Sequence, residues 1–296
     1  YEFLEEEKTI PFIEACIRVF DRFGERSKRQ KARIKFLLID WGLEKFMDEV
    51  NKVLPSIANK TVAIDTTTVN SVPNPNYKKA PEVVIENETE YNNWLRGNVV
   101  EQKQKGFYSV RIKLTNGDFY TDQARKLAEL VKDYAADDIR VSVNQGLILK
   151  FVEKDSLKYV FSKLKEFGLA KIGFDGVADV TACPGTDTCN LGIADSVHTA
   201  QVIEEFIAEQ YSELVFNNDI KIKISGCMNS CGQHSLASIG FHGSTLKVGN
   251  KILPALQVLI GGGPTGDGGG VIAEKVIKVP SKRVKQVIAT ILDDYN

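Results

Sequence analysis

Four of the chain's five cysteines fall in two close pairs. Cys183 and Cys189 flank five residues inside TACPGTDTCN, and Cys227 and Cys231 flank three residues inside SGCMNSCGQ. The two pairs are separated by the stretch 190–226. Four thiols gathered in this way can hold a metal ion, hold an iron–sulfur cluster, or cross-link the fold through disulfides.

The spacing of the cysteines leaves these uses open. Zinc pairs are usually spaced by two to four residues, which fits the second pair but not the first. One helical turn would place Cys227 and Cys231 on the same face. The flanking Gly226 and Gly232 would let the backbone approach a bulky inorganic group closely. Spacing alone therefore supports a 4Fe–4S cluster and a zinc ion equally, and a disulfide framework less well.

The composition indicates an ordinary globular protein of two or three domains. The chain has 296 residues, of which 43% are hydrophobic and 26% are charged. Its net charge of −1 gives no basic field for nucleic acid or an anionic membrane. The sequence shows no apolar run of membrane-spanning length and no signal peptide, so we expect a cytoplasmic location, where paired cysteines bind metals or catalyse. The chain begins at Tyr1, partway into an expected helix, which suggests a piece of a longer polypeptide.

The first third of the chain predicts a helical segment followed by a linker. Residues 1–60 contain a helix over about 8–22, then a basic stretch, then a second helix that ends near Pro55. Cys16 lies on the apolar face of the first helix and is interpreted as a small buried hydrophobe. Residues 61–92 are expected to be a linker, because residues 66–82 within them are rich in Pro, Asn and Thr without periodicity, which is typical of a connector.

Residues 93–182 predict a ferredoxin-like half-domain, which makes the fold class α+β. The periodicity indicates, in order, a strand at 107–114, a helix around 127–134, strands at 139–144 and 147–152, a helix around 157–164, and a last strand running into Val180. The order βαββαβ is that of the ferredoxin-like fold.

Residues 183–296 predict a mixed α/β domain that contains the four paired cysteines. We expect a helix over about 190–210, a strand with Ile222 and Ile224, a hairpin near 237–250, a strand at 255–260 and a final helix. The glycine-rich stretch 261–270 lacks the Lys-Ser/Thr of a phosphate-binding loop and is interpreted as a tightly turning surface loop.

The cysteine motifs carry a family resemblance. TACPGTDTC together with SGCMNSCGQ resembles the two cluster-binding signatures, C-x5-C and G-C-x-N-x-C-G, of the sirohaem-dependent nitrite and sulfite reductases. The stretch RSKRQKARIKFLLIDWGLEKF, residues 26–46, is similar to the basic segment that closes the first half of that family's duplicated fold. VNQGLIL, residues 143–149, resembles a strand pair in its second ferredoxin-like module. The resemblance implies the second half of the fold plus the tail of the first.

The resemblance also implies an activity, cofactors and partners. It implies an oxidoreductase in which Cys183, Cys189, Cys227 and Cys231 hold a 4Fe–4S cluster and Cys231 also bridges to the sirohaem iron. Electrons would pass from the cluster to sirohaem for the six-electron reduction of sulfite or nitrite. The implied partners are an electron donor, either ferredoxin or a flavoprotein reductase, and a missing N-terminal half that supplies anion-binding arginines and lysines. A zinc-stabilised interaction module and a 4Fe–4S electron carrier without sirohaem are the alternatives.

The resemblance also implies further contacts. Asn229 matches the Asn of the second motif and is expected to orient the loop or to contact the haem edge. The carboxylates of sirohaem call for clustered cations, for which Arg29, Lys31, Arg33 and Lys35 are the candidates. Arg140, Asn144 and Gln145 are candidates because the first-half copy of this strand pair supplies haem contacts in the family. For the basic segment the alternative is a solvated helix face, and for the last three residues it is a structural role. The three histidines, His198, His234 and His242, are expected at the surface or in the core rather than as ligands.

Overall fold

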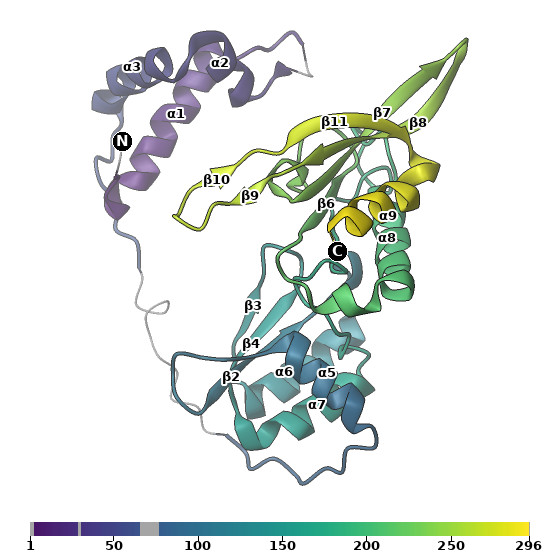
Figure 1. Ribbon diagram of the computed structural model, residues 1–296. Helices are drawn as coiled ribbons and strands as arrows, with labels where there is room; N and C mark the ends of the chain where they lie inside the picture. Colours follow the sequence, from purple (N-terminus) through teal and green to yellow (C-terminus); the bar gives the residue numbers. More distant parts are fainter. Residues whose placement is uncertain (1–2, 29–30, 66–76, 296) are drawn as a thin grey trace. The chain divides into compact units, whose positions relative to one another are not determined.

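The computed structural model describes residues 3–28, 31–65 and 77–295. The chain divides into two compact units, Tyr1–Pro73 and Asn74–Asn296, and each is described by itself. The first unit is helical, and the second contains two larger sheets with helices packed on them and a two-stranded sheet (Figure 1), so the predicted α+β class is confirmed.

Within its described residues, the first unit has three α-helices around a small apolar core. The helices are α1 Thr9–Phe23, α2 Ile34–Trp41 and α3 Leu43–Val53. The single helix predicted after the basic stretch is two helices, because Gly42 adopts φ +77°, which is outside the helical region. Cys16 packs partly buried against the core, and this burial raises the pKa of its thiol.

The second unit begins with the ferredoxin-like module, whose sheet has the order β1-β2-β4-β3 with every pair antiparallel. Its elements are α5 Glu88–Asn98, β1 Val99–Glu101, β2 Phe107–Ile112, α6 Thr121–Tyr134, β3 Ile139–Val141, β4 Leu147–Glu153 and α7 Leu157–Glu166. Helix α5 begins inside the stretch 61–92 that was expected to be a connector. Val110 and Ile112 are fully buried on the inner face of β2, as their alternation predicts. Trp94 of α5 fills the centre of this core.

The predicted last strand of this module is wrong. The edge position beside β2 is taken by β1, which precedes β2 in the chain. Residues Thr181–Ala182 instead form β5, which pairs in parallel with β6 in a second sheet. The reason is packing, because Val180 and Ala182 are buried in the core of the second sheet.

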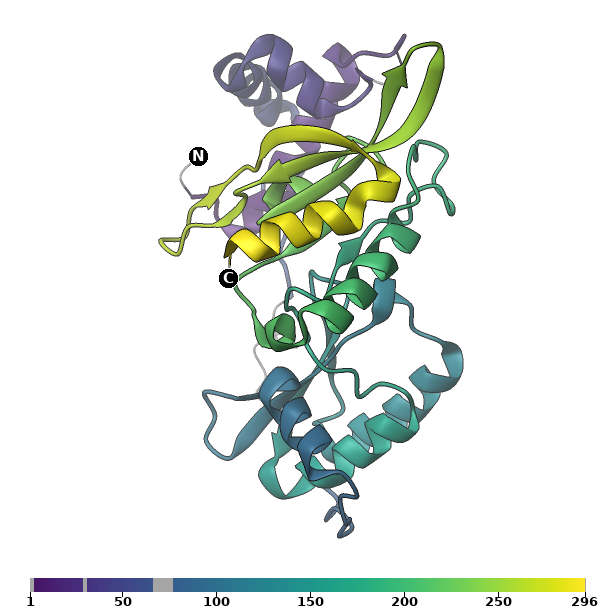
Figure 2. The ribbon, with the colours of Figure 1, turned by 45° about the vertical axis from the view of Figure 1, so that its right-hand side comes forward.

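The second sheet has the order β11-β8-β7-β6-β5, in which β5, β6 and β7 are parallel and the other pairs antiparallel. Its remaining strands and helices are α8 Ser196–Gln210, β6 Ile222–Ser225, β7 Ile239–Val248, β8 Lys251–Ile260, β11 Glu274–Pro280 and α9 Val284–Tyr295. Helices α8 and α9 lie side by side (Figure 2) and share one apolar core with the sheet.

Three sequence predictions can be compared with this second sheet. The hairpin predicted near 237–250 and the separate strand predicted at 255–260 are one longer hairpin, β7 and β8, which turns at Gly249. Helix α8 begins later than predicted, at Ser196, because the Asp195 side chain accepts a free backbone amide of the first turn, that of His198, and so caps the helix. The glycine-rich stretch is confirmed as a turning surface segment, in which β9 Gly263–Pro264 pairs with β10 Gly270–Val271.

Candidate functional site

Two neighbouring parallel strands carry the first cysteine of each pair to the same edge of the second sheet. Strand β5 ends at Ala182, directly before Cys183, and β6 ends at Ser225, two residues before Cys227. Ala182 pairs with Ile224 in the parallel register, so the two strand ends are adjacent. Such strand ends are where open α/β sheets place their binding sites.

Hydrogen bonds to sulfur form in the two cysteine loops, which are residues 183–189 and 226–231. The backbone N–H of Gly226 donates to Cys183 Sγ at 3.1 Å, and Asn229 Nδ2 donates to Cys227 Sγ at 3.3 Å. The Cys183 backbone N–H donates to the Ile224 carbonyl at 3.1 Å. Donors directed at sulfur are the outer-shell contacts that tune thiolate ligands of iron–sulfur clusters.

The glycines beside the cysteines let the two loops pack against each other. A Cβ on Gly226 would lie 2.5 Å from Gly185 Cα, and a Cβ on Gly232 would lie 2.1 Å from the Ile224 carbonyl oxygen. Gly185 itself adopts φ +56°. The space on the side of a Cβ is therefore filled by neighbouring backbone, which gives these glycines a role in loop packing. The expected close approach of their backbone to an inorganic group stays a prediction.

The second cysteine of each pair lies in a more open environment. Cys189 and Cys231 are exposed, whereas Cys227 is buried. The predicted helical turn over 227–231 is wrong, because this stretch is a non-helical turn in which Ser230 has φ +62°. All five cysteines are free thiols. In the part of the chain that the structure describes, no three His, Cys, Asp or Glu side chains are placed to hold a metal ion.

The donor set nonetheless suits an iron–sulfur centre. Four unpaired thiols, two of them already accepting N–H or amide donors, are what a thiolate-ligated cluster requires. The convergence of all four sulfurs on one group stays a prediction.

The predicted contact residues of the second unit engage other parts of the protein. Gln145 Nε2 donates to the Ala182 carbonyl at 2.8 Å, and Gln145 Oε1 accepts from the Ala182 N–H at 3.0 Å. Asn144 Nδ2 donates to Asp175. Arg140 is exposed in β3, with its Nε 3.6 Å from an oxygen of Asp138. Gln145 is therefore bonded to Ala182, the residue directly before Cys183, and Asn229 is bonded to Cys227.

The predicted basic residues belong to the first unit. Lys31 and Arg33 are exposed, and Lys35 Nζ lies 5.2 Å from the ring centroid of Phe36. Arg29 lies outside the described residues. Their contact with a cofactor stays a prediction.

Sequence reasoning missed Lys223 and Ser196. The alternation Ile222-Lys223-Ile224 suggests a solvent-facing lysine, but Lys223 is only 6% exposed and its burial lowers its pKa. Ser196, at the start of α8, donates from Oγ to the Cys183 carbonyl at 2.7 Å, and its Oγ lies 3.6 Å from Cys183 Sγ. A serine just after an N-cap gives no sequence signal for such a contact.

His234 and His242 form a buried pair. Their ring centroids are 4.9 Å apart. Burial lowers the pKa of His234 to about 4 and lowers that of His242 as well, so both rings are neutral near pH 7. Within the described residues, His234 Nδ1 and His242 Nε2 have no hydrogen-bond partner. The predicted core position is therefore confirmed for this pair, although these two nitrogens are not satisfied.

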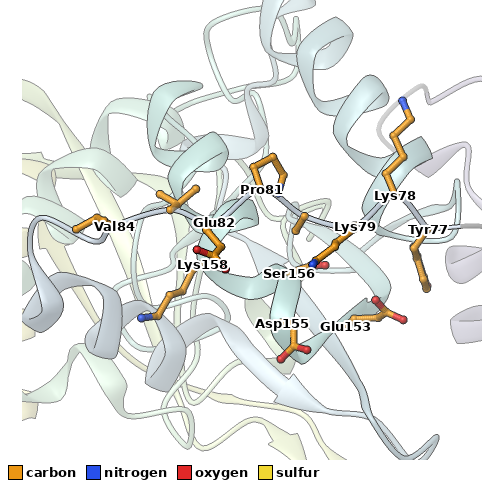
Figure 3. A pocket seen from close by; sticks show the side chains of 12 residues that line it. Tyr77, Lys78, Lys79, Pro81, Glu82, Val84, Glu153, Asp155, Ser156 and Lys158 are labelled. Carbon is orange, nitrogen blue, oxygen red and sulfur yellow. The ribbon is translucent and has the colours of Figure 1, made fainter.

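A groove of about 980 Å³ lies elsewhere on the second unit (Figure 3). The stretch 77–84 forms one wall, and Glu153, Asp155, Ser156 and Lys158 form the other. Its lining mixes carboxylates with ammonium groups and includes none of the paired cysteines or predicted contact residues. We therefore place the candidate site at the cysteine loops and not in this groove.

Two family models match most of the chain. One, described as the nitrite and sulphite reductase 4Fe-4S domain, matches residues 2–57 and 173–296. The other, described as the nitrite/sulfite reductase ferredoxin-like half domain, matches residues 100–167. The second match coincides with the module of β1 to β4, and the first includes all four paired cysteines.

Curated relatives and a solved structure agree with these models. The chain is 26% identical to ferredoxin–nitrite reductase, chloroplastic, of Zea mays over 96% of this chain and 46% of the relative. It is 28% identical to sulfite reductase [ferredoxin] 2 of Mycolicibacterium paratuberculosis over 88% of this chain and 43% of the relative. It shares its fold with the NirA protein of Mycobacterium tuberculosis, with a TM-score of 0.63, 24% identity, and coverage of 95% of this chain and 48% of the other. The chain spans less than half the length of these proteins. Among the described residues no helix has the length and apolarity needed to cross a membrane.

Proposed function

The chain belongs to the nitrite and sulfite reductase family, and from that premise we propose that it is the cluster-bearing part of an oxidoreductase that reduces sulfite or nitrite by six electrons. One observation carries the proposal. Cys183 and Cys227 stand at adjacent parallel strand ends inside the segment matched by the 4Fe-4S domain, and a backbone N–H already donates to one of the two sulfurs. The match to a 4Fe-4S domain, together with the two pairs of free thiols, supports a cluster over a zinc ion.

Cys183, Cys189, Cys227 and Cys231 would hold the cluster, with Cys231 shared with a sirohaem iron. When bound, the cluster supplies single electrons, and the sirohaem iron binds the anion and weakens its bonds to oxygen. The protein's own part is to hold the thiols and to direct donors at them. Gly226 N–H and Asn229 Nδ2 perform that role for the two thiols at the strand ends. Cys231 is exposed, which suits a thiolate that also faces a second group.

The proposal extends to partners that lie outside this chain. Ferredoxin is named as the donor of the maize and mycobacterial relatives, and we propose ferredoxin or a flavoprotein reductase as the electron donor here. We also propose that the anion is held by arginines and lysines of a first half, since this chain spans less than half of its relatives. Lys31, Arg33 and Lys35, with Arg29, are proposed to face sirohaem carboxylates. The cytoplasmic location stays a prediction.

The test is metal, sulfide and tetrapyrrole analysis. Anaerobic reconstitution with iron and sulfide should give about four irons and four sulfides per chain, with broad visible absorption. One zinc per chain without sulfide would overturn the proposal. A second arm adds sirohaem together with the first half of a relative. Absorption bands of a reduced tetrapyrrole are expected there, and a cluster that forms while sirohaem does not bind would indicate an electron carrier.

A further inference from the structure

The turn that joins β3 to β4, residues 142–146, is closed by its own hydrogen bonds. The Ser142 N–H donates to the Gly146 carbonyl at 2.8 Å, and the Gly146 N–H donates back to Ser142 Oγ at 2.9 Å. Gln145 adopts φ +68°, and Gly146 is packed so closely that a Cβ would lie 2.4 Å from the Phe174 ring. The turn therefore presents its side chains from a fixed backbone.

One side chain of this turn holds the backbone directly before Cys183. Strand β5 is the edge strand of its sheet, so one side of its backbone lacks a neighbouring strand. Both amide atoms of Gln145 occupy that side, with bonds of 2.8 and 3.0 Å to the carbonyl and N–H of Ala182. The glutamine takes the place of a neighbouring strand at the last residue before the thiol.

A second side chain of the turn is linked through a buried lysine to the side chain of Gln233, which follows Cys231. Lys223 Nζ donates to Asn144 Oδ1 at 2.7 Å and to Gln233 Oε1 at 2.8 Å. Gln233 lies two residues after Cys231 and has φ +59°. A buried ammonium group is costly without hydrogen-bond acceptors, so Lys223 needs both amides. The other amide atom of Asn144, Nδ2, donates to the carboxylate of Asp175.

We infer that the turn 142–146 is a positioning element for both cysteine loops. Gln145 fixes the strand end that carries Cys183, and Asn144 acts through Lys223 and Gln233 on the loop that carries Cys231. The role differs from the cofactor contact expected for Asn144 and Gln145 from the sequence, because their amides bind protein groups. The inference rests on the proposed function, in which these loops hold a cluster.

The test compares three variants of the 296-residue chain. Gln145→Ala removes the bonds to Ala182, and Lys223→Met removes the link between Asn144 and Gln233 while keeping an unbranched apolar stem. Gln123→Ala is the matched control, because Gln123 lies in the same module and its amide also makes two backbone bonds, to Phe167 O at 2.9 Å and from Tyr120 N at 3.4 Å. That control leaves the cysteine loops untouched.

Two measurements are made on each protein. The first is cluster loss to a chelator after anaerobic reconstitution, together with the electron paramagnetic resonance signature of the reduced cluster. The second, on the metal-free chain, is hydrogen exchange in peptides covering 181–189 and 227–236. Removing an outer-shell contact typically weakens a metal site by about 10-fold, so Gln145→Ala and Lys223→Met should lose cluster about 10-fold faster with an altered signature. Their exchange in the two peptides should also rise, while Gln123→Ala matches the parent in both measurements.

The outcomes separate this inference from the proposed function. Cluster retention that is unchanged in Gln145→Ala and Lys223→Met, or reduced equally in Gln123→Ala, overturns the positioning role. If the parent takes up no cluster, the proposed function fails and the exchange data decide alone. Faster exchange confined to the two cysteine peptides then supports positioning of the thiols, and unchanged exchange overturns it.

Discussion

A buried carboxyl group beside the site should make the stability of this protein depend on pH in an unusual direction. Asp179 is 8% exposed, and its Oδ2 accepts the Asp175 N–H at 2.7 Å. The cation that lowers its pKa, Lys113, already pairs with Glu204 at 3.0 Å. Desolvation raises the pKa of Asp179 from 3.8 to about 7, against a smaller lowering by Lys113.

The sign follows from proton binding in the two states. Between about pH 4 and pH 7 the folded protein keeps a proton on Asp179 that the unfolded chain releases, so the free energy of unfolding falls as pH rises. Each pKa unit corresponds to about 1.4 kcal/mol, so the rise from 3.8 to about 7 sets a ceiling of about 4 kcal/mol. Because burial penalties on single carboxyls are softened by relaxation, we expect about 2 kcal/mol.

The perturbation is Asp179→Asn, which keeps an oxygen for the Asp175 N–H and cannot ionise. Urea unfolding followed by circular dichroism should show equal stability of parent and variant at about pH 3, below both pKa values of Asp179, and a gain of about 2 kcal/mol for the variant at about pH 8. Asp294→Asn, at an exposed position of α9, is the control and should shift stability by less than about 0.5 kcal/mol at both pH values. Parallel stability–pH curves for parent and Asp179→Asn would refute the reasoning.

Three further predictions concern the cysteine loops and the histidine pair. Cys231→Ser should lower bound iron and sulfide after reconstitution, whereas Cys16→Ser should leave both unchanged; equal loss from the two would contradict the ligand assignment. Gly226→Ala places a methyl 2.5 Å from the backbone of the first cysteine loop and should cost about 2 kcal/mol in urea unfolding, whereas Gly270→Ala, with its nearest contact at 3.4 Å, should cost less than about 1 kcal/mol. Because burial lowers the pKa of His234 to about 4, its folded form resists protonation and the protein loses stability as pH falls from about 6.5 to 4. His234→Phe should lose about 2 kcal/mol less than the parent over that range, and an identical acid transition would count against the prediction.

Periodicity was enough to predict the regular parts of the fold. Val110 and Ile112 alternate with polar residues because one face of β2 meets the helices, and the alternation is readable without the partner strands. Strand β5 was not readable in that way. It has two residues, both buried, and its place depends on a parallel partner, β6, that lies beyond α8 in the chain. Length and burial pattern alone could not assign it to either sheet.

The site shows the same division between local and distant information. The motif spacing identifies the cysteines, but the contacts that hold their loops come from far away in the chain. Lys223 meets Asn144 across 79 residues, and Gln145 meets Ala182 across 37. A buried lysine between two isoleucines has the same local pattern as an exposed one. The folded structure is needed to show that the ammonium group of Lys223 donates to two side-chain amides.

The two halves of the cysteine site differ in how far the fold has already organised them. Cys183 and Cys227 are set by paired strands, and Cys183 receives a backbone donor from the other loop. Cys189 and Cys231 lie in exposed turns, so closing four sulfurs around one group must order the stretches between them. Part of the binding free energy of a cluster offsets the cost of ordering these stretches, which is why metal binding and folding are coupled. Contacts that already fix the ends of these stretches reduce that cost, and the amides of Gln145 and Gln233 are where the protein provides them.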